Sequence, residues 1–120
     1  MRAVKLEYDQ MPWKRFRDNT GLKYKPVKMG NLGFSKFAWE AGVAEAWHSH
    51  DQEPQIVFCV SGKVEFGVRD ERGDRTETLS AGDVILIEPG VPHRARAIEA
   101  TEMLIIFSPM NRFDSDAITI

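Results

Sequence analysis

The sequence has few of the features that would tie it to a disulfide scaffold, a nucleic acid or a membrane. Cys59 is the only cysteine among 120 residues, so no disulfide can form within the chain. The 16 Lys and Arg residues are balanced by 18 Asp and Glu residues, so no basic excess is available to neutralise phosphates. Residues 1–7 alternate polar and apolar types and contain no run of signal-peptide or membrane-spanning length. We therefore expect a soluble, cytoplasmic protein without nucleic-acid or membrane partners.

Strand signals recur along the chain, whereas no segment has a convincing helical period. Short apolar or alternating runs are separated by turns that contain Gly or Pro. The predicted strands cover residues 4–8, 22–29, 33–40, 55–60, 63–70, 76–79, 83–87, 93–98 and 101–107. This spacing is typical of an all-β sandwich or barrel.

The length of the chain predicts one domain. A chain of 120 residues can bury one hydrophobic core but not two. We expect a single domain over residues 1–120, in which N-terminal strands in 1–32 pack on a barrel core over 33–108, and 109–120 form a C-terminal tail. Cys59 lies in an apolar run and is predicted to be a small buried hydrophobe.

All the histidines of the chain fall at spacings suited to a metal site. In an extended segment the side chains of residues i and i+2 point to one face, so His48 and His50 would converge. A turn over residues 51–54 can bring Gln55 back beside them. The turn before His93 can direct that side chain to the same point from a distant strand. Four such ligands leave an open position on an ion, as in catalytic metal sites.

Two motifs in the chain resemble those of a known family. They are Gly42-x5-His48-x-His50-x4-Gln55-x6-Gly62 and Gly82-x7-Gly90-x2-His93. They resemble the two signature motifs of the cupin family, closely over residues 42–97. The chain departs from the family pattern at Gln55, where Glu is usual, and at Glu88 and Ala97, where Pro and Asn are usual.

The resemblance implies an all-β double-stranded β-helix, which is the cupin jelly-roll barrel, and a homodimer. It also implies one divalent metal ion per subunit, held by His48, His50, Gln55 and His93. Imidazole and amide ligands suit Zn, Fe, Ni, Mn or Co, so the sequence does not select the metal. Because Gln55 is neutral, such a site would carry about +2 instead of +1, which favours a small anionic or chelating oxygen substrate.

Few side chains are candidates for proton transfer. Glu88 lies beside the His93 turn, and Asp51 and Glu53 lie between the predicted ligands, where a carboxylate could move a proton. The alternative for each is a solvated surface carboxylate. A metal-bound hydroxide would remove the need for a side-chain base.

The spacing around His93 also predicts the lining of the cavity. If His93 points inward, Ala95 and Ala97 share its face and would leave a roomy cavity. Arg94 and Arg96 would then face outward, toward solvent or a second subunit.

Within the cupins, the chain resembles the small proteins of pectin and alginate breakdown that open unsaturated uronates to a linear keto form. The likeness lies in the ligand set, in Trp13 and in the ending over residues 107–112. An Asp expected two residues before Phe107 is Ile105 here. An expected Arg is displaced to Arg112, which could bind a substrate carboxylate through a bidentate contact.

Three functions remain open from the sequence. The first is a metal-dependent enzyme that polarises a small keto acid or uronate and isomerises, tautomerises or cleaves it. The second is a dioxygenase that uses Fe(II) or Mn at the same ligands. The third is a non-catalytic module that binds a sugar or metabolite, which would suit the lack of an obvious proton-transfer residue.

Overall fold

The fold consists of β-strands and one short 3-10 helix in the computed structural model, which describes residues 1–110, 113 and 116–119. The elements are η1 (Tyr8–Gln10), β1 (Lys14–Arg15), β2 (Leu22–Met29), β3 (Leu32–Trp39), β4 (Gln55–Ser61), β5 (Lys63–Asp70), β6 (Gly73–Ser80), β7 (Val84–Ile87), β8 (His93–Ala97), β9 (Thr101–Phe107) and β10 (Ile118–Thr119). The described residues form no helix with the length and apolar character needed to cross a membrane.

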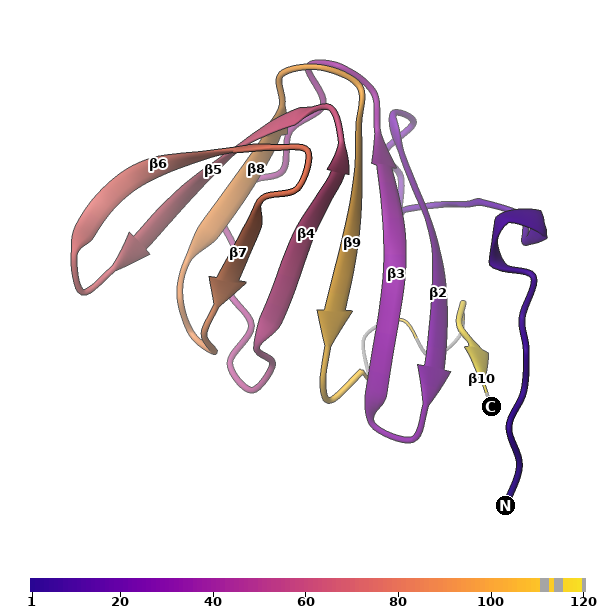
Figure 1. The fold of residues 1–120 in the computed structure, drawn as a ribbon. Coiled ribbons are helices and arrows are strands. Elements are labelled where there is room, and N and C mark those ends of the chain that lie inside the picture. Colours follow the sequence, from indigo (N-terminus) through magenta and orange to yellow (C-terminus); the bar gives the residue numbers. More distant parts are fainter. Residues whose placement is uncertain (111–112, 114–115, 120) are drawn as a thin grey trace.

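The strands form two sheets that face each other as a jelly roll (Figure 1). The large sheet has the order β1-β2-β3-β9-β4-β7, with β10 paired to β2, and the small sheet has the order β6-β5-β8. All pairings are antiparallel in the described part of the chain except that of β10 with β2. The predicted all-β class and double-stranded β-helix are thus confirmed.

The predicted strand over residues 4–8 is wrong. Residues 1–7 pair with no strand and are mostly exposed, and Tyr8 begins the 3-10 helix η1. Alternation alone does not make a strand when no sheet edge accepts the segment. The Tyr8 hydroxyl instead donates to the carbonyl of Lys25 (2.7 Å) and accepts from the N–H of Lys36 (2.8 Å), which docks η1 on β2 and β3.

The alternation along β4 shows how the core is built. Val57 and Cys59 point inward and are buried, whereas Ile56 and Phe58 point outward and are exposed. One face of this strand therefore packs in the core, and the other face lies on the surface. Cys59 is fully buried, as predicted, and burial raises the pKa of its thiol.

Candidate metal site

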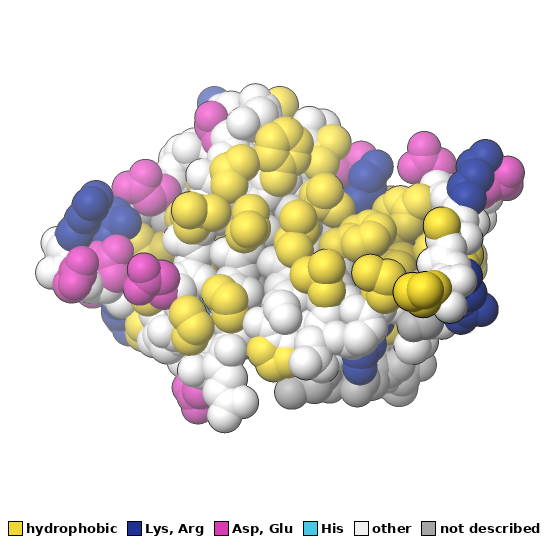
Figure 2. All heavy atoms as spheres, turned by 60° about the horizontal axis from the view of Figure 1, so that its bottom comes forward, with side chains coloured by type: hydrophobic (Ala, Val, Ile, Leu, Met, Phe, Trp, Pro, Cys, Tyr) yellow, Lys and Arg dark blue, Asp and Glu magenta, His cyan; other side chains and the backbone are white. Residues whose placement is uncertain are grey.

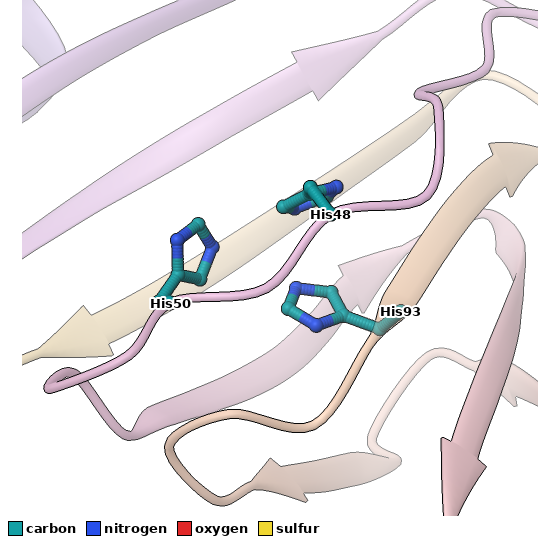
Figure 3. A group of neighbouring side chains, drawn as sticks. All are labelled: His48, His50 and His93. Carbon is teal, nitrogen blue, oxygen red and sulfur yellow. The ribbon is translucent and has the colours of Figure 1, made fainter.

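The structure brings the three histidines together at one end of the space between the sheets. His48 and His50 lie on an extended segment that runs beside β8, and His93 is the first residue of β8 (Figure 3). The N–H of His48 donates to the carbonyl of His93 (3.0 Å), and the N–H of His93 donates to the carbonyl of His48 (2.8 Å). One ring nitrogen from each histidine lies within 4.8 Å of the others, so the group could hold a metal ion.

Backbone carbonyls orient two of the imidazole rings. His48 Nδ1 lies 2.8 Å from the carbonyl oxygen of Ala46, and His93 Nδ1 lies 2.9 Å from that of Val91. A carbonyl only accepts, so in the neutral form of each ring Nδ1 carries the proton and Nε2 keeps a lone pair. Metal-binding histidines are typically anchored in this way. The residues present therefore fit a divalent ion of the type that imidazole binds.

Trp47 anchors the segment that carries His48 and His50 to the outer face of the small sheet. Its ring lies over Arg69 (Cζ to centroid 3.9 Å) and Arg94 (4.7 Å) on the outer face of the small sheet. A Cβ atom at position 67 would lie 3.1 Å from the Trp47 ring, so the absence of a side chain at Gly67 leaves room for the indole. The contact places Arg94 outward, as predicted, and fixes the residue that precedes His48.

Gln55 begins β4 in the large sheet and reaches the same space as the histidines. Its side chain is buried and lines the cavity that they line. Its Nε2 donates to Oε1 of the buried Glu53 at 3.1 Å. This bond uses the nitrogen end of the amide, which leaves the carbonyl Oε1 available to accept or to bind a cation.

Large apolar side chains fill most of the cavity between the sheets. Besides the histidines, Gln55 and Glu45, the lining residues are Phe16, Phe37, Trp39, Val57, Phe66, Met103, Ile105 and Phe113. About 40 Å³ of space is left, which is room for a few water molecules. The roomy cavity predicted from Ala95 and Ala97 is wrong, because both alanines belong to the core and bulkier side chains line the space.

The structure places the predicted acid–base residues apart from one another. Glu53 is buried behind Gln55, whereas Glu88 and Asp51 are exposed. Glu88 lines a separate depression beside β7 and does not line the histidine cavity. Arg112 lies outside the described residues.

Two charged residues near the histidines were missed by the sequence reasoning. Glu45 lines the cavity, and its Oε1 lies 3.9 Å from Nε2 of His48. Arg17 lies with Glu45, His48 and His50 around an adjoining depression. Its backbone has a φ of 55°, which is uncommon for a residue other than glycine, and no pattern in the sequence signals it.

The comparison with known families agrees with this geometry. Residues 36–108 match the family described as "Cupin domain", and the chain therefore belongs to the cupin family. No curated protein matches the sequence.

Several solved structures have a similar fold. KdgF from Halomonas sp. is 21% identical, with a TM-score of 0.79 over 93% of this chain and 97% of that one. An RmlC-like cupin from Shewanella frigidimarina is 22% identical, with a TM-score of 0.78 over 96% of each chain. The oxalate decarboxylase of Bacillus subtilis, which has Mn(II) centres, is 19% identical, with a TM-score of 0.79 over 95% of this chain and 32% of that one. At these identities the likeness concerns the fold alone.

Proposed function

We propose that this protein is a metal-dependent enzyme that acts on a small, oxygen-rich anion such as a 2-oxo acid or an unsaturated uronate. The proposed chemistry is isomerisation, tautomerisation or bond cleavage of the lyase type. The observation that carries the proposal is the convergence of three imidazoles, two of them with Nδ1 held by carbonyls, on one small cavity. We propose His48, His50, His93 and Oε1 of Gln55 as the ligands of one divalent ion per subunit.

Each part of the site has a chemical task in this proposal. A bound divalent ion would supply Lewis-acid polarisation of a substrate oxygen. Because the amide of Gln55 is neutral, it would leave the positive charge of a bound ion uncompensated. The carboxylate of Glu53 orients that amide. The apolar walls leave room for only a few water molecules. Ile105 presents an alkyl group where the uronate-opening cupins have a carboxylate, so the proposed acid–base role falls to Glu45, the described carboxylate that lines the cavity.

Glu53 allows a test of how Gln55 is held. We expect Glu53→Ala to weaken metal binding by about 10- to 100-fold, because the amide loses the partner that orients it. Glu53→Gln is the matched variant, since its carbonyl oxygen can still accept the bond from Nε2, and we expect it to retain most of the affinity. Isothermal titration with Mn(II), Co(II) and Zn(II) measures both. Equal losses in the two variants would show that the hydrogen bond does not position Gln55.

Arg17 is proposed to bind the anionic end of the substrate at the mouth of the site. Removing this cation by Arg17→Ala should raise KM by about 10-fold and leave kcat and metal affinity nearly unchanged, since one charge-assisted hydrogen bond contributes about 1.5–3 kcal/mol. Arg15→Ala is the control, because Arg15 is exposed on β1 and lines neither the cavity nor the depression. A fall in kcat without a change in KM would contradict this role.

The experiment that tests the proposal begins with elemental analysis of the purified protein. The protein is then stripped with a chelator and reloaded with one metal at a time. Unsaturated uronates and small 2-oxo acids are supplied, and products are followed by nuclear magnetic resonance. We expect turnover that depends on the metal. Equal turnover by stripped and loaded protein would overturn the proposal.

The same preparations separate the two alternatives drawn from the sequence. Oxygen uptake by the Fe(II) or Mn form with catechol-like or diketone substrates would identify a dioxygenase. A sugar or metabolite that raises the melting temperature without forming a product would identify a binding module.

A further inference from the structure

The segment that leads to His48 runs beside β8 with one residue in excess. Ala44 lies opposite Arg96, and His48 lies opposite His93. Between these two bridges the segment advances by four residues, whereas β8 advances by three. An extra residue of this kind is a β-bulge, which bends its strand and redirects the side chains that follow. The chain bends at Trp47, so the bulge lies directly before His48.

The bulge determines that His48 points into the cavity. Residues directly opposite each other in paired strands share a face, so Ala44 points outward with the exposed Arg96. His48 points inward with the buried His93. Without the extra residue, positions 44 and 48 would share one face, because residues four apart in a regular strand do so. His48 would then point to solvent, so the position of one proposed ligand depends on this irregularity of the backbone.

The side chain of Trp47 packs on a charged surface, which is the outer face of the small sheet. Hydrophobic side chains form a band across the side of the molecule shown in Figure 2. The outer face of the small sheet instead carries charged side chains, which are Glu65, Arg69, Arg94 and Arg96. Two of these cations lie over the indole, with Arg69 Cζ 3.9 Å and Arg94 Cζ 4.7 Å from its ring centroid. These contacts hold the indole outside the cavity, one residue before His48.

Gly67 provides the space in which the indole lies. It is in the middle of β5, the central strand of the small sheet, and it is buried under Trp47 and Arg94. A Cβ atom there would lie 3.1 Å from the indole and 3.3 Å from Cγ of Arg94. The φ of Gly67 lies outside the left-handed region, so the backbone does not require glycine. Glycine weakens the interior of a strand and often marks a close approach by another segment, which here is that of Trp47.

The geometry points to Trp47 as a positioning residue that keeps His48 turned into the cavity. The indole, stacked with Arg69 and Arg94 above Gly67, fixes the extra residue of the bulge in place. When this packing is lost, the segment can pair with β8 in the regular register, which directs the imidazole of His48 to solvent. Trp47 therefore raises metal affinity without touching the ion, a consequence that rests on the proposed function, in which His48 is a ligand.

Gly67→Val tests this role without weakening the sheet. A β-branched side chain suits the middle of a strand, but at this position it takes the space of the indole. We expect the affinity for Mn(II), Co(II) and Zn(II) to fall by about 10- to 100-fold, as when a group that orients a ligand is lost, and the melting temperature of the metal-free chain to stay nearly unchanged. Glu65→Val is the matched control, because it places the same side chain on the same strand and face, two residues from Gly67. It should retain native affinity. Titration calorimetry and thermal melting measure both variants.

Trp47→Leu and Trp47→Phe separate the aromatic contact from the bulk of the side chain. Phenylalanine can still stack with the two arginines, so Trp47→Phe should retain most of the metal affinity. Leucine cannot, and Trp47→Leu should lose about as much affinity as Gly67→Val.

Amide hydrogen exchange makes the test independent of the ion. The N–H of His48 donates to the carbonyl of His93 at 3.0 Å, and in metal-free Gly67→Val it should exchange about 10-fold faster than in the native chain. Native exchange and native metal affinity in Gly67→Val and Trp47→Leu would overturn the positioning role and leave the proposed function intact. Faster exchange in Gly67→Val, in a protein whose native chain binds no metal, would support the positioning role and overturn the proposed function.

Discussion

Replacement of His93 by alanine is expected to weaken metal binding by about 100-fold or more. Zinc sites with four ligands bind with roughly 10–16 kcal/mol, so one ligand accounts for about 3 kcal/mol. His93 is buried, and carbonyl contact at its Nδ1 directs Nε2 toward His48 and His50. The variant should also lose any metal-dependent turnover. Metal content after dialysis and a competitive titration with a chromophoric chelator measure the effect.

Arg96→Ala is the matched control for this loss. Arg96 lies on the same strand as His93, but its side chain is exposed and its Nη2 lies 3.6 Å from Glu65 on the outer face of the small sheet. We expect this variant to bind metal as tightly as the native chain. Native affinity in His93→Ala, with the fold intact by circular dichroism, would refute the assignment of His93 as a ligand.

Gly62→Ala is expected to lower the free energy of unfolding by about 3–5 kcal/mol. Gly62 connects β4 to β5 with a φ of 85°, where an L side chain adds about 1–2 kcal/mol of strain. A Cβ atom would also lie 2.2 Å from the carbonyl oxygen of Ala100 and 2.6 Å from Oγ1 of Thr101. Relieving that overlap disturbs the bond from the N–H of Lys63 to Thr101 Oγ1. Urea denaturation measures the loss.

Gly82→Ala separates backbone strain from the overlap. Gly82 has a similar φ of 95°, but nothing lies within 4 Å of its Cβ position. We expect a loss of only about 1–2 kcal/mol there. Equal losses at Gly62 and Gly82 would mean that the close approach of Ala100 and Thr101 adds nothing. Since small domains unfold with about 5–15 kcal/mol, Gly62→Ala would remove a large share of the stability.

The sequence predicted the strands whose patterns are long. Residues 22–29, 63–70 and 101–107 are strands with the predicted bounds. The two-residue strands β1 and β10 were missed, because two residues cannot carry a periodic signal. The error over residues 4–8 has the opposite cause, since the pattern was present but tertiary docking of Tyr8 determined the local structure.

The convergence of the histidines was predictable, whereas the surroundings of the site were not. Spacing placed His48, His50 and His93 together, and the structure confirms that proximity. Glu45 was missed because the chain between the bridges Ala44–Arg96 and His48–His93 is not a regular strand, so period-2 reasoning fails there. The catalytic roles of Glu53, Glu88 and Arg112 stay predictions, and the exposure of Glu88 makes it a weak candidate.

The proposed ligands come from both halves of the sandwich, since Gln55 starts a strand of the large sheet and His93 starts a strand of the small one. An ion held by both would act as a non-covalent cross-link between the two layers. Occupancy would then add to the resistance of the fold to heat, by about 2.7 kcal/mol at a hundred times the dissociation constant. Melting curves recorded across a metal titration would therefore rank the candidate ions before any substrate is known.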